Sequence, residues 1–180
     1  NALGRFQGSK DIPLNDLGCE QAASLARVIG RLAGDVAPLD YVASPLSRAA
    51  QTMAILRSEL GLSPEAFRRE PRLKEISFGR WEGFTWTELR RRDPQSVAEH
   101  RADPWRYRPP EGESYSDLSV RVMAAIGEIT RDAVVVTHGG VVRAILHALT
   151  GMPAQEAVFL PVRQGAVYLI EDGAFELALA

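Results

Sequence analysis

The 180-residue sequence predicts an α/β fold, a three-layer α/β/α sandwich with a mostly parallel central sheet and an inserted cover segment over the site. Two short apolar runs, at residues 41–44 and 133–136, have the length of buried strands, and a helical pattern follows each one at once. Residues 71–113, called the cover below, lack a long periodic element, and irregular segments of that size are usually functional. We therefore expect residues 1–180 to form a single domain that carries the cover as an insertion.

The first half of the chain contains clear start and stop signals for two helices. Asn15 is a good N-cap for a helix that Gly34 should end, because glycine readily adopts the backbone turn that follows a helix. At Ser44-Pro45 a capping residue precedes a proline suited to a first helical turn, which predicts a second helix ending near Gly61.

The cover is irregular, basic and aromatic. A short strand is expected just before it, at 67–70, and Thr85 to Glu88 form a capping box that should open a short helix. Residues 68–108 carry eleven Arg or Lys against seven Asp or Glu, and they hold all three tryptophans. Two interpretations stay open, an arginine-rich solvated surface or a basic, aromatic cover over an anion site.

The second half predicts two further helices and three strands. Ser114 or Ser116 should cap one helix, and another should follow His138. The three consecutive valines of strand 133–136 predict burial on both faces. Two C-terminal strands are expected at 166–170 and 175–179, joined by a turn at Asp172-Gly173.

Composition limits the classes of function and partner. A net charge of −2 argues against nucleic acid or a membrane surface as the partner, and no apolar run approaches the length of a membrane span. The single cysteine, Cys19, lies in a helical pattern where we expect it to fill the core, and its isolation fits the cytoplasm. A small-molecule substrate is expected, and a homodimer stays open.

The junction at His138 combines three features of an anion site. It follows strand 133–136, and ligands of open α/β sheets bind beyond the carboxyl ends of the strands. Gly139 and Gly140 would let a ligand approach the backbone, and the helix that starts there offers free N–H groups and a positive dipole end. A tight turn around a hydrogen-bonded histidine is the alternative.

Other polar residues have the chemistry to join such a site. Arg48 follows strand 41–44 by one helical turn, where a guanidinium can hold a phosphate through two parallel hydrogen bonds. Glu75 can act as a proton donor if burial raises its pKa, and Arg5 and Gln7 are candidate oxyanion donors. Each of these residue types, met alone, is more often an ordinary surface or loop residue.

Six motifs taken together resemble the histidine phosphatase superfamily, also called the phosphoglycerate-mutase-like family. They occur in the family's order and extend from the first residue to beyond residue 140. The motifs are Asn1-x-x-x-Arg5-x-Gln7-Gly8, Pro13-Leu14-Asn15-x-x-Gly18-x-x-Gln21-Ala22, Ser44-Pro45-Leu46-x-Arg48-Ala49-x-Gln51-Thr52, Leu73-x-Glu75-x-x-Phe78-Gly79-x-Trp81-Glu82-Gly83, Pro110-x-Gly112-Glu113-Ser114 and Thr137-His138-Gly139-Gly140.

The resemblance implies a two-step hydrolysis of phosphate monoesters. A nucleophilic histidine takes the phosphoryl group, an acid protonates the leaving alcohol, and water then attacks the phosphohistidine. By position, Arg48 would bind the phosphoryl oxygens, His138 would stabilise the transition state as the second, non-nucleophilic histidine, and Glu75 would donate the proton. The family requires no metal, and no other cofactor is implied.

The same resemblance assigns the substrate pocket and the branch of the family. Asn1, Arg5, Gln7 and the backbone of Gly139 are the expected substrate-binding groups. Mutases of the family generally carry a longer insertion than the one found here after Glu75, which favours the small phosphatase branch acting on small phosphorylated metabolites.

The nucleophilic histidine is expected just upstream of Asn1. In the family an Arg-His-Gly motif ends a first strand at that place, and this sequence begins after it. His100 and His147 are not expected to replace it, because the first lies in the cover and the second inside a predicted helix. Two alternatives stay open, a phosphoglycerate mutase and a catalytically inert module that binds a phospholigand.

Overall fold

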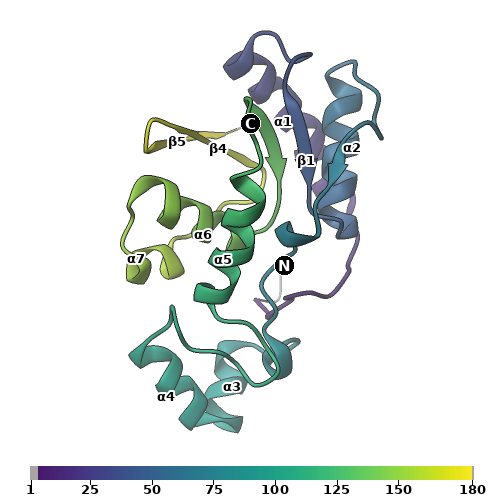
Figure 1. The fold of residues 1–180 in the computed structure, drawn as a ribbon. Coiled ribbons are helices and arrows are strands. Elements are labelled where there is room, and N and C mark those ends of the chain that lie inside the picture. Colours follow the sequence, from purple (N-terminus) through teal and green to yellow (C-terminus); the bar gives the residue numbers. More distant parts are fainter. Residues whose placement is uncertain (1–3, 180) are drawn as a thin grey trace.

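The computed structural model describes residues 4–179 and places helices on both faces of a short parallel sheet (Figure 1). The sheet order is β2-β1-β3, with β1 (Asp40–Ala43) between β2 (Arg68–Arg69) and β3 (Ala133–Val136), and both neighbours are parallel to it. Two further strands, β4 (Ala166–Glu171) and β5 (Ala174–Leu179), form an antiparallel hairpin. The predicted α/β class with a mostly parallel central sheet is confirmed.

The helices divide between the two faces of the sheet and the cover. In chain order, the described α-helices are α1 (Asp16–Ala33), α2 (Ser47–Glu59), α3 (Trp86–Arg92), α4 (Pro94–Ala102), α5 (Tyr115–Ile126), α6 (Gly139–Thr150) and α7 (Ala154–Phe159). Two short 3₁₀ turns, η1 (Pro71–Leu73) and η2 (Gly79–Trp81), lie in the cover.

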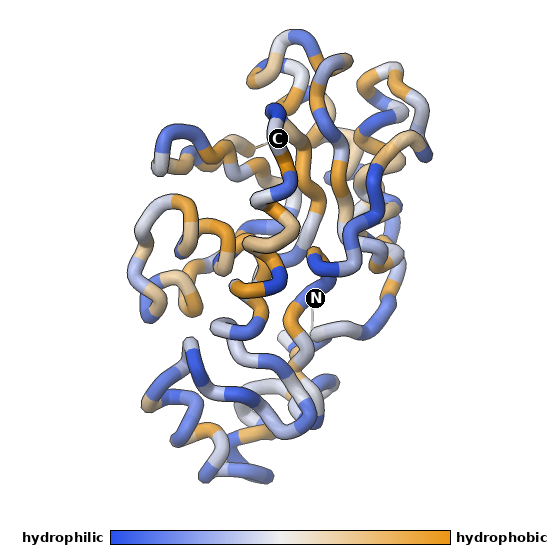
Figure 2. The backbone as a smooth tube through the Cα atoms, in the orientation of Figure 1, coloured by the Kyte–Doolittle hydropathy of each residue, from blue (hydrophilic) through white to orange (hydrophobic). Residues whose placement is uncertain are grey.

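Alternate residues of β1 enter two separate hydrophobic cores. Tyr41 and Ala43 pack with residues of α1 and α2, whereas Val42 packs with residues of α5 and α6, because successive side chains of a strand point to opposite faces. Hydrophobic residues accordingly concentrate in the strands and in the helices beside them, while the α3–α4 region is largely hydrophilic (Figure 2). The sheet is therefore the middle layer of three.

Several local signals were confirmed at the residues that carry them. Asn15 caps α1 by accepting the N–H of Gly18 at 2.9 Å, and Gly34 follows the helix with φ of 67°. Thr85 forms the predicted capping box at the start of α3. The hairpin turns at Asp172 and Gly173, both with positive φ.

The second predicted helix starts later than the sequence indicated. We expected it to open at Ser44-Pro45, but α2 begins at Ser47. Ser44 Oγ accepts the N–H of Leu46 at 3.3 Å, which keeps these residues in a turn. The cap comes from a distant loop instead, since the Asp11 carboxylate accepts both the N–H and the hydroxyl of Ser47, at 2.6 and 2.9 Å.

Two burial predictions were wrong. All four residues of β3 are only half-buried rather than buried on both faces, since within residues 4–179 the strand pairs with β1 along one edge alone. Cys19 is exposed and fills no core, because the first turn of α1 lies beyond the core and its buried stripe begins at Ala22.

The middle of the cover forms a lobe at one end of the molecule, with α3 and α4 as its helices (Figure 1). Trp81, Leu89 and Val97 make a small core of their own, separate from the two cores of the sandwich. Within the part of the chain that the structure describes, no helix is both long enough and apolar enough to cross a membrane.

Candidate active site

His138 stands at the carboxyl edge of the sheet, at the N-cap position of α6 and two residues after the end of β3. The residue is 7% exposed, its Nδ1 lies 3.2 Å from Nε of Arg48, and its Nε2 lies 2.8 Å from Oγ of Ser44. Since a guanidinium N–H can only donate, Nδ1 accepts, and the single ring proton on Nε2 donates to Ser44. Burial, and then the charges of Arg48 and Arg121, lower the pKa of His138 to about 3, so the ring is neutral at pH 7.

Ser44 is the buried partner that orients this ring, and the sequence did not single it out for that role. It is 0% exposed and is the first residue after β1, whereas His138 is the second residue after β3. Ala43 pairs with Val136 in the parallel ladder, so the ends of the two strands lie side by side. The sequence did offer one signal for this role: Ser44 is a small hydroxyl residue at the end of a predicted strand, at the same kind of position as His138.

Arg48 extends from the first turn of α2 to the N-terminal loop and to His138. Its Nη1 donates to the carbonyl of Lys10 at 2.7 Å and its Nη2 to the carbonyl of Gly8 at 3.2 Å, while Nε donates to His138. Burial lowers the pKa of Arg48 and the carboxylates of Glu75 and Asp11 raise it, and a guanidinium stays charged at neutral pH.

The hydrogen bonds of Arg48 leave part of its guanidinium for a ligand. Arginine has five N–H groups, and the three bonds that Arg48 makes within the described residues use one on each nitrogen. Two N–H groups remain, one on each Nη, and guanidinium N–H groups of this kind can donate to the oxygens of a phosphoryl group. The side chain is therefore held rigid before any ligand arrives.

Glu75 is partly buried and its carboxylate faces the start of α6. Its Oε1 accepts the N–H of Ile76 at 2.9 Å and that of Gly140 at 3.1 Å. Burial raises the pKa of Glu75, against the opposing effects of these amides and of the Arg48 and Arg143 charges. A carboxyl group with a raised pKa beside Gly140, two residues after His138, is suited to carry a proton.

Two close contacts fix the segment of Glu75 against the end of β3. The hydroxyl of Thr137 donates to the carbonyl of Leu73 at 2.9 Å. A Cβ on Gly140 would lie 2.5 Å from Oε1 of Glu75 and 2.9 Å from a methyl of Ile76, so only glycine leaves room for the carboxylate. His138, Arg48 and Glu75 are thus brought together from three separate stretches of the chain.

The other predicted site residues lie as follows. Arg5 donates through Nη1 to the carbonyl of Gly83 at 2.7 Å and to the Glu88 carboxylate at 2.9 Å, which engages it with the cover. Gln7 lies in the loop whose carbonyls bind Arg48, and its own carbonyl accepts the N–H of Lys10. Gly139 is the first residue of α6, and Asn1 lies outside the described residues. The substrate-binding roles of these four stay predictions.

Glu82, a second carboxylate in the motif that contains Glu75, has a structural role. Its Oε1 accepts the N–H groups of Ser9 and Phe78, at 3.0 and 3.2 Å. A Cβ on Gly8 would lie 2.0 Å from that oxygen, so Glu82 packs directly against the loop that supplies carbonyls to Arg48. This contact joins the cover to the N-terminal loop.

A cavity of about 250 Å³, called the recess below, opens in the cover. Aromatic and cationic side chains line it: Trp86, Arg90, His100, Arg101 and Phe159. The buried Nδ1 atom of His100 has no hydrogen-bond partner among residues 4–179, and burial lowers the pKa of the ring. Trp86 also contacts the N-terminal loop, since its ring lies 5.0 Å from that of Phe6.

A second cavity lies away from these residues, beside β1 and β2. It measures about 600 Å³, and Asp40 at the start of β1 is among its lining residues. Its Arg68 is already paired with carboxylates, those of Glu70 and Glu128. Across residues 4–179, no group of three or more His, Cys, Asp or Glu side chains is arranged to hold a metal ion.

Comparison with known proteins identifies one family. The model of the histidine phosphatase superfamily (branch 1) matches residues 1–177. A glucosyl-3-phosphoglycerate phosphatase of Mycolicibacterium vanbaalenii is 34% identical over 85% of this chain, and a metal-independent phosphoserine phosphatase of Arabidopsis thaliana is 33% identical over 83%. The aligned regions span 70% and 63% of those two relatives.

Solved structures give the same result for the fold. The α-ribazole phosphatase of Shigella flexneri superposes with a TM-score of 0.78 at 27% sequence identity, covering 99% of this chain and 89% of that one. The arrangement of sheet and helices described above is therefore shared with an enzyme of known structure.

Proposed function

Because the chain belongs to the histidine phosphatase superfamily, we propose that it is a phosphomonoester hydrolase that works through a phosphohistidine intermediate on small phosphorylated metabolites. One observation carries the proposal most directly. A rigid guanidinium with two remaining N–H groups, a neutral buried histidine and a carboxyl group of raised pKa lie together at the carboxyl edge of the sheet.

Each of the three side chains has a role that its surroundings support. Arg48 binds two phosphoryl oxygens through its Nη pair, and its three existing hydrogen bonds hold it in position. His138 lies against Arg48 and stabilises charge that develops on the phosphoryl oxygens, after the approach of a dianion raises its affinity for a proton. Glu75 donates its proton to the leaving alcohol.

The mechanism also needs a nucleophile and a complete phosphate pocket. In the family's pattern the nucleophilic histidine lies just upstream of the position matching Asn1, and the proposal places it there. Asn1, Arg5, Gln7 and the backbone of Gly139 complete the pocket in this proposal. We also propose that the protein is cytoplasmic and forms a homodimer. Sedimentation of the purified protein tests the dimer.

The recess supports an anionic substrate. Arg90 and Arg101 supply positive charge, and Trp86 and Phe159 supply apolar faces. The two curated relatives are named for glucosyl-3-phosphoglycerate and for phosphoserine, which are both alkyl phosphates that also carry a carboxylate. We propose that this enzyme takes an alkyl phosphate of the same kind and that the recess contributes to its selection.

The test is release of inorganic phosphate from a panel of phosphate esters, with the intact mass of the enzyme measured first. His138→Ala and Arg48→Ala should each lower turnover by at least about a hundredfold, and Arg131→Ala is the matched control, since Arg131 is 67% exposed and pairs with Asp40. Full activity in the His138 or Arg48 variant would contradict their assignment. Isomerisation of 3-phosphoglycerate without phosphate release would identify a mutase, and phosphate binding without turnover an inert module.

A further inference from the structure

The motif Pro110-x-Gly112-Glu113-Ser114 takes no part in the steps proposed above, yet its residues surround the segment that carries Glu75. We propose that Arg121, locked in place by Glu113, is a positioning residue that sets the backbone of Glu75 for proton donation. The proposal rests on the assignment of Glu75 as the proton donor, and it concerns a side chain that touches neither the substrate nor the reacting atoms.

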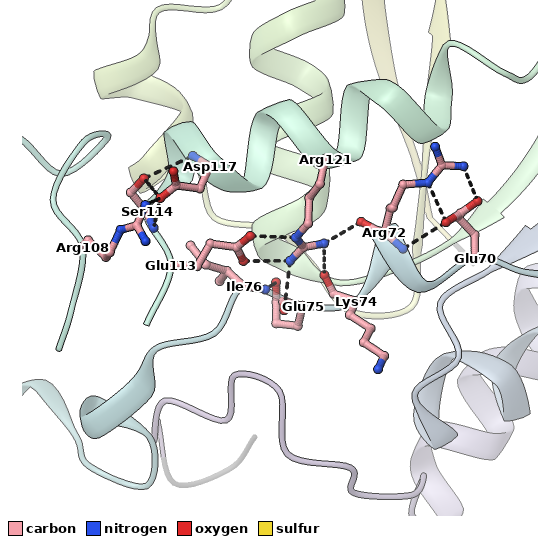
Figure 3. A network of polar contacts seen from close by, with 10 residues as sticks. All are labelled: Glu70, Arg72, Lys74, Glu75, Ile76, Arg108, Glu113, Ser114, Asp117 and Arg121. Carbon is pink, nitrogen blue, oxygen red and sulfur yellow. Dashed lines mark hydrogen bonds and ion pairs between the residues drawn. The ribbon is translucent and has the colours of Figure 1, made fainter. Parts of the chain in front are cut away.

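Arg121 uses all five of its N–H groups (Figure 3). Two of them, on Nε and Nη2, bind the two oxygens of the Glu113 carboxylate at 2.7 and 2.8 Å. The other three donate to backbone carbonyls within the short stretch 72–75. Their acceptors are the carbonyls of Arg72, Lys74 at 2.9 Å and Glu75 at 3.3 Å.

The carbonyls of Lys74 and Glu75 belong to backbone outside regular secondary structure, whereas that of Arg72 lies in the 3₁₀ turn η1. The 3₁₀ turn η1 ends at Leu73, and η2 begins only at Gly79, so the residues between them lie in neither helix nor strand. A backbone carbonyl that loses its partner away from water costs about as much as a lost hydrogen bond. The guanidinium of Arg121 therefore determines the path of the chain into Glu75.

The far side of Glu75 is fixed by the same motif. The N–H of Glu113 donates to the carbonyl of Ser77 at 2.8 Å. A Cβ on Gly112 would lie 2.9 Å from that carbonyl oxygen, so the two stretches of backbone are in close contact. Ser114 caps the helix α5 that carries Arg121, through a capping box with Asp117. One motif thus orders both the guanidinium and the segment it binds.

The requirement is for an arginine and not merely for a positive charge. The planar guanidinium presents its donors in a fixed fork, and here that fork binds a carboxylate along one edge and backbone carbonyls along the other. A lysine at position 121 has three donors on one nitrogen and cannot span both partners. It would keep the charge near Glu113 while releasing the carbonyls of Lys74 and Glu75.

The first test is the dependence of the rate on the leaving group. p-Nitrophenolate leaves without protonation, whereas an alkoxide needs the proton of Glu75. Arg121→Lys should lower kcat for the fastest alkyl phosphate of the panel by roughly 10- to 100-fold, and should leave kcat for p-nitrophenyl phosphate within about twofold. KM should change little for either substrate, because Arg48 is untouched.

Matched variants separate positioning from general stability. Glu113→Gln keeps an acceptor for Arg121 but removes the ion pair, and should give a smaller loss of the same kind. Arg108→Lys is the control for Arg121→Lys, because Arg108 is a 61% exposed arginine that pairs with Asp117 of the same helix. Equal losses on both substrates in Arg121→Lys would overturn the proposal.

A second measurement needs no catalytic activity and so distinguishes this proposal from the proposed function. The N–H groups of Ile76 and Gly140 donate to the Glu75 carboxylate, and Gly140 lies in the first turn of α6, where no carbonyl of the helix can accept its N–H. Their hydrogen exchange, followed by NMR, should be about tenfold faster in Arg121→Lys and unchanged in Arg108→Lys. Unchanged exchange in Arg121→Lys would overturn the proposal even for an inactive protein.

Discussion

The unfolding free energy of this protein should fall as the pH drops below about 6.5 because His138 resists protonation in the folded state. An unfolded histidine binds a proton near pH 6.5, whereas the pKa of His138 in the folded protein is about 3. Between these values the unfolded chain binds more protons than the native one, so stability is present above pH 6.5 and is lost toward pH 3.

The size of the effect follows from the two pKa values. Each pH unit in this window changes the unfolding free energy by up to about 1.4 kcal/mol, so His138 should account for a loss of about 2 kcal/mol between pH 7.5 and pH 5.0. The structural cause is burial of the ring next to Arg48, with Nδ1 already accepting a hydrogen bond from that cation. A protonated ring would face the guanidinium with a second positive charge.

Urea unfolding at pH 5.0, 6.0 and 7.5 measures this directly in the wild type and in His138→Gln. The loss of unfolding free energy between pH 7.5 and pH 5.0 should be about 2 kcal/mol smaller in the variant. Groups such as His100 titrate in both proteins, and their contribution cancels in the difference. His147→Gln is the control, a histidine of α6 that hydrogen-bonds the carbonyl of Met152. Losses that agree within roughly 0.5 kcal/mol in the wild type and His138→Gln would refute the reasoning.

Three further predictions concern catalysis. Glu75→Gln should lower kcat on alkyl phosphates by about 10²- to 10⁴-fold and spare p-nitrophenyl phosphate, and equal losses on the two would contradict its role as the acid. Arg48→Lys keeps the charge but loses the paired Nη groups, so Kd for inorganic phosphate, measured by calorimetry, should rise at least about tenfold; unchanged binding would count against a bidentate contact. Gly140→Ala places a Cβ 2.5 Å from Oε1 of Glu75 and should lower kcat on alkyl phosphates, with Gly30→Ala of α1, where a Cβ makes only an ordinary contact with Leu60 at 3.9 Å, as the comparison for folding.

The parts of the site that the sequence predicted are those that sheet topology brings together. His138 and Arg48 follow two strands that pair in parallel, and carboxyl ends of parallel strands meet at one edge. Caps such as Asn15 and Thr85 were equally readable, because their hydrogen bonds reach only three residues along the chain. In these places, local sequence and chain topology together determine the geometry.

The missed helices show where such reasoning stops. The structure has a helix, α4, at 94–102 that the sequence analysis does not predict. Asp93 and Pro94 do mark its start, as an N-cap and a proline in the first turn. Only Val97 of that helix is buried, so no apolar period of 3.6 residues announces it. The six residues of α7 are too few for a periodic pattern, and the C-terminal tail was interpreted as strand pieces alone.

Glu75 belongs to a third case, in which the sequence shows the motif but not the hydrogen bonds that hold its backbone in place. The partners of Arg121 lie 8 residues away at Glu113 and 46 to 49 residues away along the segment of Glu75, and no local pattern connects them. This difference has a functional consequence. His138 and Arg48 are held by the sheet and the N-terminal loop, whereas the segment of Glu75 is held mainly by side-chain hydrogen bonds from Arg121 and Thr137. Substitutions of Arg121 or Glu113 should therefore alter protonation of the leaving group and leave phosphate binding intact. Substitutions at the strand ends should alter both.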